Sequence, residues 1–211
     1  MKRIWGLVAV LVLGSAAPSL ALLGPQTSVG VRVGTGVFQS DTVFGADADI
    51  ESVIVLGVTA GMRQGNFGGE ISVDQISVDL KTYIKQAEIT MIPILLTGQF
   101  HPMEEDDPFD PYFGAGVGYY INSASASSEA KAVVASRGGS DYKVEVDNSV
   151  GFHMAVGANM EVSSVVAFVI DARYALTSTD LTLKASSFSD SDSINLNGLA
   201  VTAGLKYFFP K

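Results

Sequence analysis

The segment Asp110–Tyr120, DPYFGAGVGYY, alternates glycine with larger apolar residues. Gly114, Gly116 and Gly118 occupy every second position. Successive residues of a β-strand point to opposite faces, so a strand here has one apolar face and one nearly bare face. Because glycine weakens a strand, this pattern indicates an environment where empty space on one face is useful.

The same two-residue period recurs along the chain, with turn-rich stretches between the repeats. Such persistent alternation predicts an all-β protein. Together with the first segment, the predicted strands number eight, and the other seven are Ser28–Phe38, Ser52–Arg63, Phe67–Asp74, Ile92–Phe100, Gly151–Glu161, Phe168–Leu176 and Leu199–Phe209.

The Gly65-Asn66 pair between the second and third strands is a two-residue hairpin signal. A two-residue turn fixes which residues of the two strands lie opposite each other. The predicted register places Val58 opposite Val73 and Ala60 opposite Ile71. Apolar side chains then share one face of the hairpin.

The composition of the two faces decides which one points outward. The apolar face of the predicted strands carries no Lys, Arg, Asp or Glu, as either a lipid-facing surface or a dry core requires. The other face carries mostly glycine, serine, threonine and alanine, whereas a water-facing exterior is rich in charge. We therefore predict an eight-stranded antiparallel transmembrane β-barrel with lipid outside and small residues in a narrow lumen.

An even number of strands returns both chain ends to the periplasmic side. Short turns are expected there, at Gly65-Asn66 and Val162–Val165, and long extracellular loops at the other end. The predicted outer connections are Phe38–Glu51, Leu80–Glu88, Asn122–Asn148 and Thr177–Asn195. The exception is the acidic connection Pro102–Pro111, which this topology places in the periplasm.

The chain begins like an exported protein. Lys2 and Arg3 precede an apolar run, Ile4–Leu13, and Ser19-Leu20-Ala21 is a small-residue cleavage site. These features predict a signal peptide over residues 1–21 and a barrel domain over residues 22–211. Removing the two basic residues changes the formal charge from -9 to -11, which argues against nucleic acid as a partner. The predicted location is the bacterial outer membrane.

Several motifs resemble the eight-stranded outer-membrane barrels of the outer membrane protein W and opacity-like group. IPILLTGQF (Ile92–Phe100) followed by PYFGAGVGYY (Pro111–Tyr120) is similar to that group's proline-containing fourth strand and glycine-rich fifth strand. DARY (Asp171–Tyr174) and GLKYFF (Gly204–Phe209) are similar to its last two strands. The resemblance implies insertion by the barrel assembly machinery into a membrane of lipid and lipopolysaccharide.

Eight ionisable residues fall on the predicted lumen face, four of each sign. They could form a charged constriction, or a buried ion-pair network that fills the lumen, and pairing favours the second interpretation because unpaired buried charge is costly. The eight are Arg32, Arg63, Glu70, Asp74, Glu161, Asp171, Arg173 and Lys206.

The sequence offers little for catalysis or metal binding. A hydrolase needs a positioned base and nucleophile, but the residue two positions after His153 is Ala155, where a lipid hydrolase would need serine. His101 lies at the periplasmic rim. With two histidines and no cysteine we predict no enzyme activity, no cofactor and no metal site. The acidic runs Asp41–Glu51, Glu104–Asp110 and Asp190–Asp192 lack calcium-loop spacing and are interpreted as solvated loops.

Two functions remain open. The first is a barrel that is structural or passes small hydrophobic solutes across the outer membrane, as the resemblance implies. The second is a surface adhesin or receptor that binds a host or phage ligand through its outer loops, above all residues 123–148. An outer-membrane lipid hydrolase is a distant third.

Overall fold

The structure is a computed structural model that describes residues 26–38, 41–43, 46–50, 53–81, 85–104, 107–126, 143–185 and 188–210. The predicted signal peptide lies outside this range. No helix among the described residues is long and apolar enough to cross a membrane. These residues form twelve strands: β1 (Gln26–Phe38), β2 (Asp41–Val43), β3 (Ala46–Ile50), β4 (Val53–Gln64), β5 (Phe67–Lys81), β6 (Lys85–Phe100), β7 (Phe109–Ala126), β8 (Lys143–Val146), β9 (Ser149–Ser163), β10 (Val166–Ala185), β11 (Phe188–Asn195) and β12 (Gly198–Phe208).

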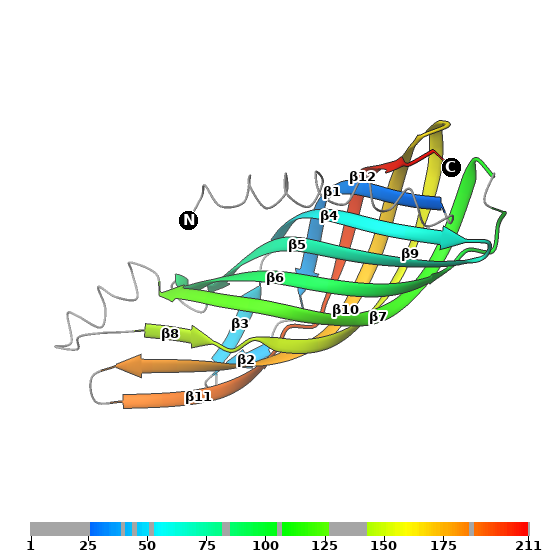
Figure 1. Cartoon of the computed structure of the whole chain (residues 1–211). Coiled ribbons are helices and arrows are strands. Elements are labelled where there is room, and N and C mark those ends of the chain that lie inside the picture. The colour runs from blue at the N-terminus through cyan, green and yellow to red at the C-terminus, as the bar shows by residue number, and fades with distance from the viewer. Residues whose placement is uncertain are drawn as a thin grey trace.

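Eight long antiparallel strands close into a barrel (Figure 1), as the alternation predicted. They follow one another around the wall in the order β1, β4, β5, β6, β7, β9, β10 and β12. Pairing of β1 with β12 closes the ring, and it sets Arg32 opposite Gly204 and Gly30 opposite Lys206. Closure leaves no unpaired sheet edge in the wall, which is what a strand-built membrane span requires.

The predicted hairpin register is confirmed. Val58 lies opposite Val73 and Ala60 opposite Ile71. Gly65 has φ +60°, a left-handed conformation that favours glycine in a two-residue turn.

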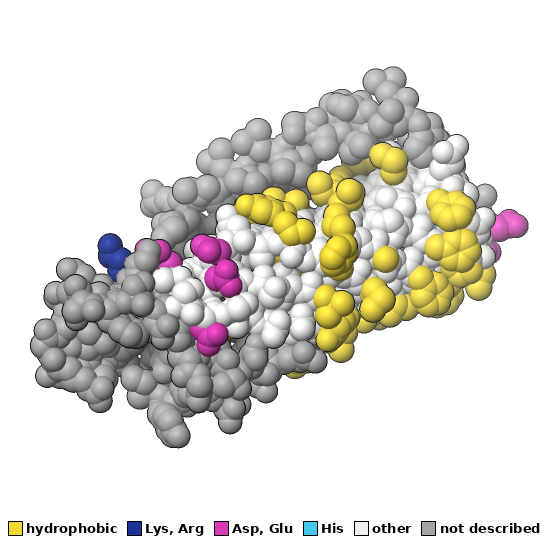
Figure 2. Space-filling model, turned by 90° about the horizontal axis from the view of Figure 1, so that it is seen from below, with side chains coloured by type: hydrophobic (Ala, Val, Ile, Leu, Met, Phe, Trp, Pro, Cys, Tyr) yellow, Lys and Arg dark blue, Asp and Glu magenta, His cyan; other side chains and the backbone are white. Residues whose placement is uncertain are grey.

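The apolar face points outward, also as predicted. Val31, Ile54, Leu96 and Phe113 expose 50, 69, 60 and 59% of their surface. On the side shown in Figure 2, apolar side chains gather in patches along the barrel wall, and the charged side chains of the described residues lie toward its two ends. An outward apolar surface of this kind is stable only against lipid.

The glycines of β7 and its neighbours make room for large side chains in the lumen. A Cβ at Gly118 would lie 2.9 Å from a ring carbon of Tyr120, and one at Gly157 would lie 2.5 Å from the hydroxyl of Tyr112. The bare face that raised the question in Asp110–Tyr120 is therefore the space into which these rings fit.

The four predicted outer connections contain strand structure. Residues 177–185 continue β10, which pairs with β11 on one side and β8 on the other. This three-stranded extension projects beyond one end of the barrel in Figure 1. The strand continues here because it has a pairing partner on both sides.

Candidate functional site

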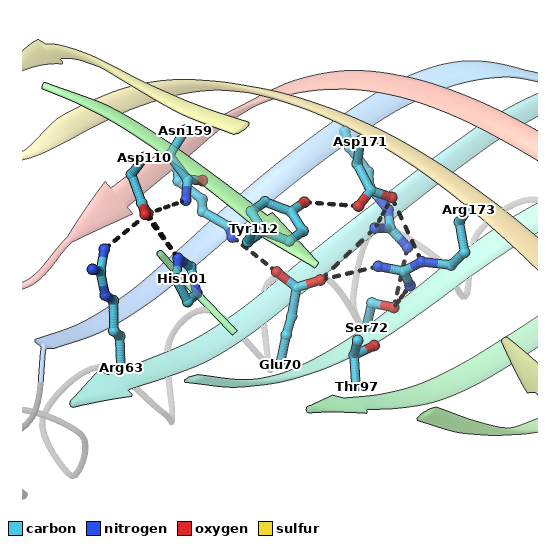
Figure 3. A network of polar contacts seen from close by, with 12 residues as sticks. Arg63, Glu70, Ser72, Thr97, His101, Asp110, Tyr112, Asn159, Asp171 and Arg173 are labelled. Atoms are coloured by element: carbon cyan, nitrogen blue, oxygen red, sulfur yellow. Dashed lines mark hydrogen bonds and ion pairs between the residues drawn. The ribbon is translucent and has the colours of Figure 1, made fainter. Parts of the chain in front are cut away.

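Glu70 on β5 is the centre of a buried ion-pair network inside the barrel (Figure 3). Its Oε2 lies 2.9 Å from Lys206 Nζ on β12, and its Oε1 lies 3.3 Å from Arg173 Nη2 on β10. Arg32 Nη1 on β1 lies 3.9 Å from Oε1. One carboxylate on β5 thus links three other strands. Two of them, β1 and β12, pair to close the barrel, and the third is β10.

Arg32 also forms a two-point contact with Asp74 on β5. Its Nε donates to Oδ1 at 2.9 Å and its Nη2 donates to Oδ2 at 2.6 Å. This parallel arrangement is the strongest geometry of a carboxylate with a guanidinium. Gly57 permits it, because a Cβ there would lie 3.2 Å from Arg32 Nε and closer still to the Asp74 carboxylate.

Asp171 on β10 completes the network. It accepts a hydrogen bond from Tyr112 Oη at 2.7 Å and lies 3.6 Å from Arg32 Nη1 and 3.5 Å from Arg173 Nε. Ser72 Oγ accepts from Arg32 and Arg173, each at 3.1 Å. The network therefore contains three cations (Arg32, Arg173, Lys206) and three carboxylates (Glu70, Asp74, Asp171), and its formal charge is zero.

A second polar cluster closes the periplasmic end. Asp110 at the start of β7 accepts from His101 Nδ1, Arg63 Nη1 and Asn159 Nδ2, each at 2.9 Å. Arg63 also donates to the carbonyl oxygens of Gly65 and Met103, at 2.8 and 2.7 Å. These bonds attach the acidic connection between β6 and β7 to the barrel rim.

The structure thus brings together six of the eight predicted lumen residues. Arg63 belongs to the separate rim cluster, and Glu161 is exposed beside a rim pocket of about 310 Å³ rather than part of the network. Asp110 was interpreted as part of a solvated acidic loop, and this is wrong because it is 7% exposed. Sequence reasoning also missed Tyr112 and Asn159. The signal was present for Asp110 and Tyr112, since they lie four and two residues before Gly114 and so continue its lumen-facing alternation.

The lumen histidine on β9 is held by a threonine on β6, across the intervening strand β7. His153 Nε2 lies 2.9 Å from Thr97 Oγ1, and His153 is 2% exposed. Ala155 follows on the same face, so no serine stands beside this histidine on β9.

Part of the outer end of the lumen is filled by large apolar side chains, whereas the alternation predicted small residues along the lumen. Side chains from β4, β5, β6, β10, β11 and the residue after β11 form one buried cluster, consisting of Val53, Val55, Ile76, Met91, Leu181, Ile194 and Leu196. The contributors from the outer extension, Leu181, Ile194 and Leu196, fold inward over the lumen. Beneath the cluster is a small cavity of about 40 Å³, lined mainly by apolar surface and floored by Arg32, Asp74, Asp171 and Arg173.

The family model for the OmpW family matches residues 25–209, which is most of the chain. The chain belongs to the OmpW family. Comparison with curated protein sequences gave no match.

Solved outer-membrane proteins share the fold of this OmpW-family chain. OprG from Pseudomonas aeruginosa is 22% identical with a TM-score of 0.68, and the alignment covers 89% of this chain and 98% of OprG. AlkL in lipid bilayers is 16% identical with a TM-score of 0.60, covering 89 and 91%. Protein W of E. coli is 18% identical with a TM-score of 0.53, covering 89 and 100%. The protein is therefore a barrel of the bacterial outer membrane.

In this OmpW-family barrel the ion-pair network and the apolar cluster have different chemical capacities. The network is buried, paired and neutral, so an apolar molecule that crossed it would have to separate these pairs. The apolar cluster above it has the surface chemistry to hold a hydrophobic solute.

Proposed function

We propose that the barrel admits small hydrophobic solutes at its outer end and releases them sideways into the outer membrane. The observation that supports this most strongly is an interruption of the β5–β6 ladder beside the apolar cavity. The proposal selects one of the two roles considered for the barrel.

The straight path through the lumen is closed to such a solute. Below the cavity it would meet Glu70, which is 3% exposed and contacts three cations. Separating these pairs to let an apolar molecule pass would leave buried charges without partners, at about 3–5 kcal/mol for each pair broken. An exit through the wall would leave these ion pairs intact.

The strand pairing of the wall is interrupted next to the cavity. Pairs between β5 and β6 run from Phe67↔Phe100 to Val73↔Ile94 and resume at Ile76↔Met91. The two positions between, Asp74 with Pro93 and Gln75 with Ile92, are not paired. Proline has no N–H to donate, which accounts for the local loss of pairing.

The interruption and the cavity are contiguous. Asp74, Pro93, Ile76 and Met91 all line the cavity. A solute there lies against the part of the wall where the β5–β6 pairing is interrupted, and lipid lies on the other side.

A reversible crosslink across the interruption tests the proposal. The chain has no cysteine, so Gln75→Cys with Ile92→Cys introduces a single pair at facing outward positions. We expect uptake of a fluorescent apolar probe by cells to fall on oxidation and to recover on reduction. The matched control is Val33→Cys with Leu56→Cys, which joins facing outward residues in the fully paired β1–β4 ladder. Equal uptake by the two oxidised proteins would contradict sideways release.

The adhesin interpretation rests on residues 123–148, and 127–142 of these lie outside the described residues. It stays a prediction.

A further inference from the structure

We propose that the apolar cavity prefers solutes that carry one neutral oxygen atom, such as alcohols or ketones, over hydrocarbons and over carboxylates. This inference rests on the proposed function and names the chemical class of its solute. It comes from two buried hydroxyl groups and from the charge of the cavity floor.

Two hydroxyls that line the cavity have no hydrogen-bond partner among the described residues. They belong to Tyr120, which is 4% exposed, and Thr202, which is 5% exposed. Buried polar groups in folded proteins are almost always paired, so two unpaired hydroxyls in one cavity point to a ligand atom that pairs with them. Each hydroxyl can donate to or accept from an oxygen atom.

The Tyr120 ring is held in place by the wall around it. A Cβ at Gly118 would lie 2.9 Å from a Tyr120 ring carbon, and one at Gly151 would lie 3.0 Å from it. These two glycines on β7 and β9 leave the space that the ring occupies. Thr202 reaches the cavity from β12, which is separated from β7 by β9 and β10 around the wall. The two hydroxyls therefore approach the cavity from different strands.

The charge of the floor argues against an anionic solute. Arg32 and Arg173 line the cavity, but both already contact Asp171, and Arg32 binds Asp74 with two hydrogen bonds. The network as a whole has as many carboxylates as cations. A carboxylate head would add a buried negative charge without a free cation, whereas a neutral oxygen adds none.

The cavity volume sets where the oxygen sits. About 40 Å³ is room for a small polar head or a water molecule, not for a whole solute. The hydrocarbon part must therefore displace apolar side chains above the cavity, such as Phe38 at the end of β1 and Leu196 between β11 and β12. The oxygen then lies deepest, next to Tyr120 and Thr202.

Methyl NMR of the whole barrel in lipid nanodiscs tests this preference. n-Octane, 1-octanol and octanoate are each added as a fraction of the lipid, and the shifts of the Met91 and Ala200 methyl groups report occupancy of the cavity that they line. We expect 1-octanol to bind roughly tenfold more tightly than n-octane or octanoate, because only its neutral hydroxyl satisfies the site.

Variants assign the preference to the two hydroxyls. Tyr120→Phe and Thr202→Val should each lower the preference of 1-octanol over n-octane, while the outward-facing control Tyr207→Phe should keep it. Equal binding of the three solutes, or an unchanged preference in both variants, would overturn this inference and leave the proposed function standing. No shift at Met91 or Ala200 with any solute would overturn both. If Tyr120→Phe does not fold, Thr202→Val and the wild-type solute series still decide.

Discussion

Replacing Glu70 with glutamine should destabilise the barrel by about 3 kcal/mol, near the lower end of the range for breaking a buried ion pair. The side chain keeps its size and one oxygen acceptor but loses its charge. Three cations then face two carboxylates in a lumen where Glu70 is 3% exposed. The loss comes from the uncompensated charge, so it should be partly recovered when Lys206→Met removes one cation from the Glu70→Gln protein.

The free energy of unfolding is measured by urea titration of the barrel in lipid vesicles, with heat-modifiable gel mobility to separate folded from unfolded chains. The matched control is Glu161→Gln, because Glu161 is exposed and contributes nothing to the network. Its change should stay within about 0.5 kcal/mol, as for surface substitutions generally. If Glu70→Gln costs no more than the control, or if Lys206→Met adds to the loss instead of reducing it, the barrel is not stabilised by charge balance within the ion-pair network.

Two further predictions concern a glycine of the lumen and the polar cluster at the periplasmic rim. Gly57→Ala should destabilise the barrel by about 1–3 kcal/mol because the new methyl overlaps the Asp74 carboxylate, whereas Gly69→Ala, with nothing within 4 Å of its Cβ, should have little effect on the same urea titration. Equal effects of the two alanines would contradict the assignment of lumen and outer faces. Asp110→Asn should cost about 1–3 kcal/mol and raise proteolysis of the β6–β7 connection, since Arg63 loses its charged partner. Glu161→Gln, at an exposed rim residue, is its control, and similar proteolysis of both would show that the rim cluster does not anchor the connection.

Local rules in the sequence determined much of the fold. The two-residue turn at Gly65-Asn66 was enough to pair β4 with β5 in the correct register, because a tight turn leaves no freedom to shift one strand. Alternation assigned Val117 to the outside and Gly116 to the inside, since the strand period is two and one face must be apolar against lipid.

The site depended on information that alternation lacks. Arg32, Glu70 and Lys206 were expected in the lumen, but which of them touch depends on the stagger between strands after closure. Glu161 has the correct parity and still lies outside the network, because its position near the end of β9 places it at the rim. The buried apolar cluster at the outer end was not predicted. Its residues Leu181, Ile194 and Leu196 come from segments that were predicted as loops, and the sequence pattern does not show that these segments fold back over the lumen.

The central claim is that lipid contacts the apolar face and that the lumen is closed to it, and one solid-state NMR measurement on the unmodified barrel tests this directly. Magnetisation is transferred from lipid acyl-chain protons to assigned valine methyl groups. Two valines are compared, Val117, which is 46% exposed, and Val55, which is 2% exposed. We expect strong transfer to the Val117 methyl groups and none above background to those of Val55. Strong transfer to Val55 with none to Val117 would show that the faces are reversed and would contradict the sealed lumen and sideways release together.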